Sequence, residues 1–298
     1  MVSGPRGFRV FRGPNGVAEA LGASVVAFGK FDGVHRGHRA LLDRALAAGR
    51  RLGLPAGAAT FERHPHAYLR ADRVPPALTS LADRLRLLRD AGAAFVVVLP
   101  TNATVLGLSA EDFARNVLRD RMGVRLVVVG DNFRFGRGGS GDVATLRRLV
   151  SVTGLDGVEI GMETVDGEVA SATGIRTHLA HGEVGRAAEL LGRPYEVLGR
   201  LDGGSPAVVW AGAARAVPAP GRYQASIRSG RWASRGTAAL VTVCGVSGGR
   251  HRLEVERRNG EAPVAPSGRA VRVAFLATSE LHGASRAVIQ GERRTCGG

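Results

Sequence analysis

Short apolar runs alternate with longer segments of helical periodicity along the first two thirds of the chain. Four of these runs carry apolar residues at successive positions: Ser24 to Phe28, Gly57 to Phe61, Phe95 to Leu99 and Leu126 to Gly130. Such runs are typical of parallel strands that are covered on both faces. The alternation of strands and helices therefore predicts a doubly wound α/β sheet of the Rossmann type.

Capping residues predict where two of the connecting helices begin. The helical segment Ser80 to Ala91 follows Thr79, a favoured N-cap residue, and ends at Gly92. A second helix opens at Ser109, and Asp112 three residues later forms an acidic variant of the capping box.

The pattern changes near residue 195. A last helical stretch, Glu183 to Leu191, is followed by a Gly-Arg-Pro turn and then by short alternating segments that Gly, Pro and Ser separate. This pattern predicts a small antiparallel barrel or sandwich. We therefore expect two domains, residues 1–194 and 195–298. The large aromatic side chains expected in the core of the second are Trp210, Trp232 and Phe275.

The composition is that of a folded globular protein, with 44% hydrophobic and 22% charged residues among 298. The net charge of +15 comes from 41 basic and 26 acidic residues, and Lys30 is the only lysine. Because the arginines are scattered, they predict a solvated basic surface rather than a nucleic-acid interface. A phosphorylated ligand is compatible with this charge.

Two cysteines, Cys244 and Cys296, are too far apart for a CxxC metal site and too few for a disulfide framework. The N-terminal residues lack the apolar run of a signal peptide, and no stretch approaches the ~18 apolar residues of a membrane span. We expect a soluble, cytoplasmic protein without a membrane partner.

The segment GKFDGVHRGH, Gly29 to His38, leads from the first predicted strand into the first predicted helix. Phosphates bind at such junctions because backbone N–H groups and the helix dipole favour an anion. His35 and His38 are three residues apart, so both rings can project to one side of a helix start and donate hydrogen bonds to phosphate oxygens. Taken alone, the spacing favours a metal site or a helix cap.

Two further segments favour a phosphate site instead. GDNFRFG, Gly130 to Gly136, follows the fourth strand and so lies at the same carboxyl edge of the sheet. In SATGIRTHL, Ser171 to Leu179, two hydroxyls precede a helix that has Arg176 in its first turn. Hydroxyls, helix-start N–H groups and a guanidinium together suit a triphosphate. His64 and His66 lack Cys or carboxylate neighbours, so we expect no metal site in the protein.

With TFERHP, Thr60 to Pro65, and LLGRPYEVLGRL, Leu190 to Leu201, these motifs resemble those of the bacterial bifunctional riboflavin kinase/FMN adenylyltransferase family, also called FAD synthetase. The resemblance covers residues 20–200. It implies a Rossmann-like nucleotidylyltransferase domain followed by a riboflavin-kinase-type β-barrel. It also implies adenylyl transfer from ATP to FMN, with magnesium, to give FAD and pyrophosphate.

The resemblance also implies roles for individual residues, with His35 and His38 as the catalytic pair. The residues that it implies in binding ATP and its phosphates are Gly29, Lys30, Phe31, Asp32, Asn132, Ser171, Thr173 and Arg176. Those that it implies in binding FMN are Phe61, His64, Pro65 and Phe135. No side-chain base is needed, because the attacking FMN phosphate is already an oxyanion.

The sequence departs from the family in places. Ala172 replaces a second serine, Arg63 replaces a proline, and Lys30 stands where the family often has a neutral residue. The kinase signature Pro-Thr-Ala-Asn has no counterpart, since the residues between Gly199 and Gly221 include no Thr or Asn. We therefore expect a degenerate barrel without riboflavin kinase activity.

Two other functions stay open. The chain could be a nucleotidylyltransferase that acts on another phosphorylated small molecule, or a non-catalytic regulator that binds flavin or nucleic acid. The motif residues required for chemistry favour the enzyme, and nothing in the sequence indicates the oligomeric state.

Overall fold

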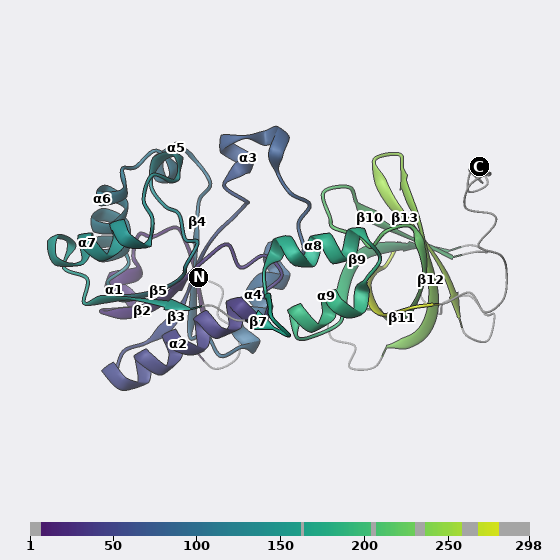
Figure 1. Ribbon diagram of the computed structural model, residues 1–298, viewed down its shortest axis with the longest axis horizontal. Helices are drawn as coiled ribbons and strands as arrows, with labels where there is room; N and C mark the ends of the chain where they lie inside the picture. The colour runs from purple at the N-terminus through teal and green to yellow at the C-terminus, as the bar shows by residue number, and fades with distance from the viewer. Residues whose placement is uncertain (1–6, 162–163, 204–206, 230–235, 258–267, 280–298) are drawn as a thin grey trace. The chain divides into compact units, whose positions relative to one another are not determined.

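Two compact units, Met1–Ala172 and Thr173–Gly298, make up the protein in a computed structural model (Figure 1). The structure describes residues 7–161, 164–203, 207–229, 236–257 and 268–279. Trp232 and Cys296, about which the sequence raised expectations, lie outside the described residues. The expected functional division into residues 1–194 and 195–298 stays a prediction.

A six-stranded parallel sheet forms the first unit, in the order β1-β4-β3-β2-β5-β6. The strands are β1 (Arg9–Arg12), β2 (Ser24–Phe28), β3 (Ala56–Phe61), β4 (Phe95–Leu99), β5 (Val124–Gly130) and β6 (Gly157–Gly161). The chain winds from β2 through β3 to β4 in one direction, and from β5 to β6 in the other. This confirms the predicted doubly wound fold. The winding reverses between β2 and β5, and in open α/β sheets the carboxyl ends of the strands beside such a reversal form the ligand crevice.

Both faces of this sheet are covered. Val26 and Phe28 of β2 belong to one hydrophobic cluster, and Val25 and Ala27 belong to a second. The longer helices are α2 (Arg36–Leu52), α4 (Leu81–Asp90), α7 (Val143–Thr153) and a helical segment formed by α6 (Ala110–Asp112) and the π-helical η3 (Phe113–Arg121). Short elements complete the unit: α1 (Val17–Leu21), α3 (His66–Leu69), η2 (Ala71–Arg73), α5 (Ala103–Leu106), η4 (Arg137–Gly139), β7 (Thr164–Val165) and β8 (Glu168–Val169).

One predicted cap is wrong by a residue. Ser80, not Thr79, caps α4, because its Oγ accepts a hydrogen bond from the Asp83 amide at 3.1 Å. The cap predicted at Ser109 is confirmed, since its Oγ accepts from the Asp112 amide at 3.0 Å.

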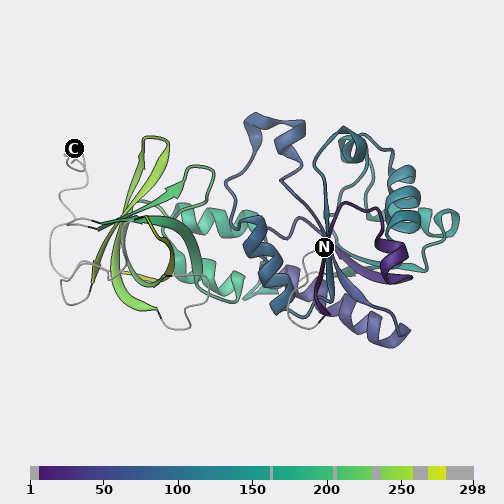
Figure 2. The same cartoon turned by 180° about the vertical axis from the view of Figure 1, so that it is seen from behind.

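A closed antiparallel barrel forms most of the second unit, which confirms the predicted β-barrel (Figure 2). Its strands are β9 (Tyr195–Asp202), β10 (Ala207–Gly212), β11 (Gly221–Ser229), β12 (Thr237–Ser247), β13 (Arg250–Arg257) and β14 (Ala270–Thr278). The helices α8 (Ala172–Ala180) and α9 (Val184–Leu191) precede it. Because α9 packs on β9 and β14, the second unit begins before the barrel strands do.

Side chains fill the barrel interior. Tyr223 and Phe275 pack edge to face with their ring centroids 5.4 Å apart, so the expected core position of Phe275 is confirmed. The expectation for Trp210 is wrong, because this partly exposed residue lies between the buried Val209 and Ala211. Successive residues of a strand face opposite sides, so Trp210 points out of the barrel.

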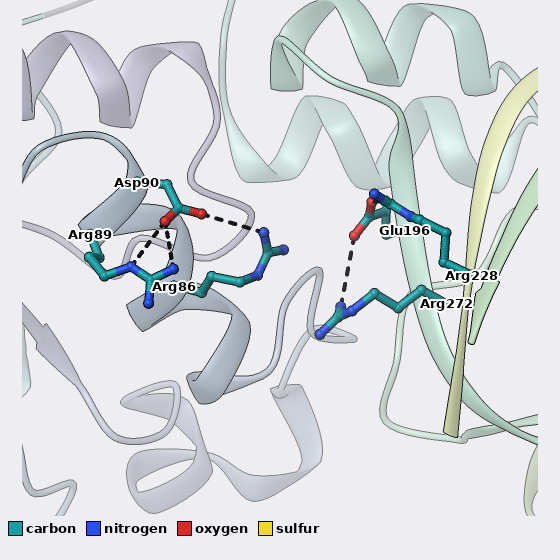
Figure 3. Close-up of polar contacts among 6 residues, drawn as sticks. All are labelled: Arg86, Arg89, Asp90, Glu196, Arg228 and Arg272. Atoms are coloured by element: carbon teal, nitrogen blue, oxygen red, sulfur yellow. Dashed lines mark hydrogen bonds and ion pairs between the residues drawn. The ribbon is translucent and has the colours of Figure 1, made fainter. Parts of the chain in front are cut away.

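Ion pairs neutralise part of the arginine surface within each unit (Figure 3). In the first, Asp90 pairs with Arg89 and Arg86 on α4. In the second, Glu196 pairs with Arg228 and Arg272 from two neighbouring barrel strands. No helix within the described ranges is long and apolar enough to cross a membrane.

Candidate active site

The loop from Gly29 to His35 joins β2 to α2 in an unusual backbone conformation. Phe31, Gly33 and Val34 all have positive φ angles, of 52°, 85° and 43°. This conformation is strained for a β-branched residue such as Val34. The side chains of Phe31 and Val34 are buried in the sheet core, and this burial offsets the strain. Phe31 therefore has only its backbone available for the predicted ATP contact.

Asp32 anchors this loop to the segment before α4. Its Oδ1 accepts hydrogen bonds from the amide and the hydroxyl of Thr79, at 2.9 and 3.1 Å, and its Oδ2 accepts from the Leu78 amide at 3.1 Å. The Thr79 hydroxyl in turn accepts from the Gly33 amide at 2.9 Å. Thr79 thus stabilises the loop after β2 instead of capping the helix.

The two histidines stand at the start of α2 and face each other. His35 is the N-cap, and its Nδ1 accepts a hydrogen bond from the His38 amide at 3.3 Å. The proton of neutral His35 therefore sits on Nε2. The rings are stacked with centroids 3.6 Å apart, so both project to one side as the spacing predicted. His35 therefore caps the helix and also projects its ring to the same side as the ring of His38. The sequence had offered a helix cap as an alternative to a phosphate-binding pair.

His38 is held in its neutral form. Burial lowers its pKa well below the ordinary value of 6.5, and electrostatic interactions with His35, Arg84 and Lys30 lower it further. Its ring also packs against Phe31, with centroids 4.9 Å apart, and its buried Nδ1 has no hydrogen-bond partner among the described residues. His38 can therefore exchange hydrogen bonds with a ligand at neutral pH without being a fixed cation.

Gly37 allows a second segment to approach the histidines. A Cβ at this position would lie 2.7 Å from the Ala170 carbonyl oxygen and 3.2 Å from Nδ1 of His35. Only glycine fits so close an approach without movement. The carbonyl of residue 170 thus lies against the start of α2, and Ser171 is the next residue in the chain.

Aromatic rings join the carboxyl ends of β2, β3 and β5. Phe28 makes edge-to-face contacts with Phe61 at 5.8 Å, Phe113 at 5.7 Å and Phe133 at 5.3 Å. Phe135 stacks on Phe133 at 5.5 Å but is buried, whereas Phe133 and Phe61 are partly exposed. Sequence reasoning missed Phe133, although it belongs to the same motif as Phe135.

The other predicted residues of the first unit lie on loops at this edge. Asn132 is exposed in the turn after β5. Of the segment after β3, His64 and Pro65 are partly exposed, and Nδ1 of His64 accepts from the His66 amide at 3.2 Å. The exposed Arg63 is tied through its backbone N–H and C=O to the Thr101 hydroxyl, each at 3.1 Å.

Thr173 and Arg176 belong to the second unit, on α8. Arg176 is the fifth residue of this helix and so lies on its second turn, one turn later than predicted. Thr173 is exposed and Arg176 is partly buried. Their meeting with the histidines around one nucleotide stays a prediction.

Buried Arg84 of α4 is the polar residue that sequence reasoning missed entirely. Its guanidinium contacts the loops after β2 and β3. The available signal was its spacing from Leu87 and Leu88, which places it on the apolar face of the helix. Within the described residues, no group of three or more His, Cys, Asp or Glu side chains could hold a metal ion.

Comparison with known proteins shows what the chain is similar to. The FAD synthetase family profile matches residues 17–174. The bifunctional riboflavin kinase/FMN adenylyltransferase of Escherichia coli K12 is 34% identical over 194 residues, which are 65% of this chain and 62% of that protein. The Pseudomonas fluorescens protein of the same name is 34% identical over 177 residues, 59% of this chain and 57% of that one. The matched region thus spans less than two thirds of the length of these relatives.

The match to a solved structure includes residues of both units. The crystal structure titled as a macrolide-efflux protein from Streptococcus pneumoniae superimposes with a TM-score of 0.75 and covers 94% of this chain and 93% of its own. The sequence identity is 22%, so this likeness supports the fold alone.

Proposed function

Because this chain belongs to the FAD synthetase family, we propose that it is an FMN adenylyltransferase, which transfers AMP from magnesium-bound ATP to FMN. The observation that carries the proposal is the stacked histidine pair at the N-terminus of α2. It lies beside the point where the strand order reverses, where open α/β sheets bind nucleotides.

The proposed reaction is an in-line displacement at the α-phosphorus of ATP. An oxygen of the FMN phosphate forms a bond to this phosphorus, while the bond to the bridging oxygen of the β-phosphate breaks and pyrophosphate leaves. Nε2–H of His35 and the backbone N–H groups at the start of α2 supply hydrogen bonds to the negative charge. Exposed Lys30 adds a cation at the same loop.

Magnesium enters with ATP as part of the substrate. The one carboxylate in the histidine loop, Asp32, already accepts three hydrogen bonds from Leu78 and Thr79, so its oxygens anchor the loop. Phosphate oxygens of the nucleotide are the ligands left for the metal, as in other phosphoryl-transfer sites.

We further propose that the barrel lacks riboflavin kinase activity. The sequence between Gly199 and Gly221 contains no Thr or Asn, and Ala207–Gly212 of this stretch form β10, a strand of the barrel wall. Glu254 and Glu256 of β13 alternate with the buried Leu253 and Val255 and therefore face outwards. They form ion pairs with arginines.

The test is to incubate the protein with magnesium and ATP and either FMN or riboflavin, and then to separate the flavins by chromatography. We expect FAD from FMN, and neither FMN nor FAD from riboflavin. FMN made from riboflavin would contradict the loss of the kinase. Absence of FAD from FMN, with adenylylation of another phosphorylated acceptor, would contradict the choice of substrate.

A further inference from the structure

Arg84 is a buried cation that the proposed reaction does not yet use. It is 8% exposed and lies on the apolar face of α4 with Leu87 and Leu88. Arginine is rarely buried without a function or a charged partner, because burial of a charge is unfavourable. The neighbouring Arg89 on the same helix behaves ordinarily and pairs with Asp90 near the surface (Figure 3).

Among the described residues, Arg84 donates its hydrogen bonds to neutral oxygens of the loop after β2 and of the end of β3. Its Nη1 donates to the Lys30 carbonyl at 2.9 Å, to Oγ1 of Thr60 at 3.0 Å and to the Phe61 carbonyl at 2.9 Å. Thr60 reinforces the connection, because its hydroxyl also donates to the Lys30 carbonyl at 2.9 Å. The guanidinium thus joins the start of the histidine loop to the start of the segment that holds His64 and Pro65.

The charge of Arg84 is retained inside the protein. Burial lowers its pKa from the ordinary value of an arginine, while the nearby Asp32 carboxylate raises it. Its buried Nε has no hydrogen-bond partner among the described residues. A fixed positive charge lies beneath the loop that we propose binds the triphosphate, where it costs no reorganisation when an anion arrives.

The segment between β3 and α4 is therefore tied to the histidine loop at both ends. Arg84 and Thr60 connect its beginning to Lys30, and Thr79 connects its end to Asp32. Two of the residues expected to bind FMN, His64 and Pro65, lie between these two connections.

We propose that Arg84 is a positioning residue for adenylyl transfer, which holds the histidine loop and the FMN-binding segment at a fixed separation. This inference rests on the proposed function. The attacking and leaving oxygens must be aligned to a fraction of an ångström for in-line displacement. The guanidinium supplies that alignment by fixing the backbone on which each substrate rests.

The test compares Arg84→Lys, Arg84→Met and Thr60→Val with Arg89→Lys, a matched change on the same helix. We expect Arg84→Lys to lower kcat about 10- to 100-fold with less than about a threefold change in either KM, because lysine keeps the charge but loses the planar fork. Thr60→Val, which removes one of the connected oxygens, is expected to lower kcat less. Arg89→Lys is expected to leave kcat unchanged.

The pH profile separates the charge of Arg84 from its geometry. The side chains whose electrostatic interactions lower the pKa of His38 are the cations Arg84 and Lys30 and the neighbouring His35. Arg84→Met removes one of these cations and so raises the pKa of His38. As pH is lowered, protonation of His38 should therefore reduce kcat at a higher pH in this variant than in the wild type. Arg84→Lys should keep the wild-type profile.

Hydrogen exchange provides a readout that needs no turnover and does not depend on Arg84→Met folding. We expect Arg84→Lys to speed amide exchange in residues 29–35 and 61–64 but not in α7. Wild-type kcat in Arg84→Lys, or unchanged exchange in both segments, would overturn the inference. A wild-type protein that makes no FAD would instead contradict the proposed function, while the exchange result would still report on Arg84.

Discussion

The contact between Gly37 and Ala170 allows one perturbation to be worked out in detail. In Gly37→Ala the new Cβ would lie 2.7 Å from the Ala170 carbonyl oxygen, and relief to an ordinary contact of about 3.4 Å requires a movement of about 0.7 Å. The second close neighbour is Nδ1 of His35, at 3.2 Å. The movement therefore displaces the segment before Ser171, the imidazole, or both.

The effects on stability and on rate should differ. Overpacking costs about 1–3 kcal/mol, and the higher helix propensity of alanine returns about 1 kcal/mol, so we expect a loss of about 0–2 kcal/mol in unfolding free energy. A displacement approaching 1 Å in a catalytic site can lower the rate about 100-fold. We therefore expect kcat for FAD formation to fall about 10- to 100-fold while the protein stays folded.

Gly185→Ala is the matched control. Gly185 lies in α9, and a Cβ there would meet nothing within 4 Å. Alanine should raise the unfolding free energy by up to about 1 kcal/mol and leave kcat unchanged. FAD formation followed by flavin fluorescence, with urea unfolding of each variant, measures both quantities. Wild-type kcat in Gly37→Ala would refute the reasoning.

Three further predictions concern the loop and its surroundings. Asp32→Ala removes the acceptor of three hydrogen bonds and releases the strained loop. We therefore expect kcat/KM for ATP to fall at least about tenfold in steady-state assays. An unchanged value would contradict the anchoring role of Asp32. Because the pKa of His38 is lowered in the folded protein, the unfolded chain gains a proton below pH 6.5 that the folded chain does not. The stability of the wild type relative to His38→Asn should therefore decrease as pH falls from 8 to 5 in urea titrations. A pH-independent difference would exclude this linkage. Ser80→Ala removes the N-cap of α4 and should lower the unfolding free energy by about 1 kcal/mol without lowering kcat. A lower kcat with unchanged unfolding free energy would show that Ser80 has another role.

Local pattern was sufficient to predict much of the sheet. The bounds of β2 and β4 coincide with the predicted apolar runs, because central parallel strands are buried on both faces. The stacked histidines also followed from their spacing at a helix start.

Contacts between distant residues could not be predicted in this way. Asp32 and Thr79 are 47 residues apart, and no local pattern connects a loop carboxylate to a hydroxyl that itself resembles a helix cap. Arg84 looked like one more arginine of a basic surface, and only the fold brings its guanidinium to the carbonyl oxygens of Lys30 and Phe61. Trp210 faces outwards although its size favours a core position, because the alternation of β10 places it between the buried Val209 and Ala211.

The position of the label from radioactive ATP tests most directly whether this chain transfers an adenylyl group. The protein is supplied with FMN and riboflavin together and with ATP labelled either at the α-phosphate or at the γ-phosphate. We predict that the α-label appears in FAD, that the γ-label appears only in pyrophosphate, and that His38→Asn slows the transfer. Appearance of the γ-label in any flavin, or no α-label in FAD, would contradict the account.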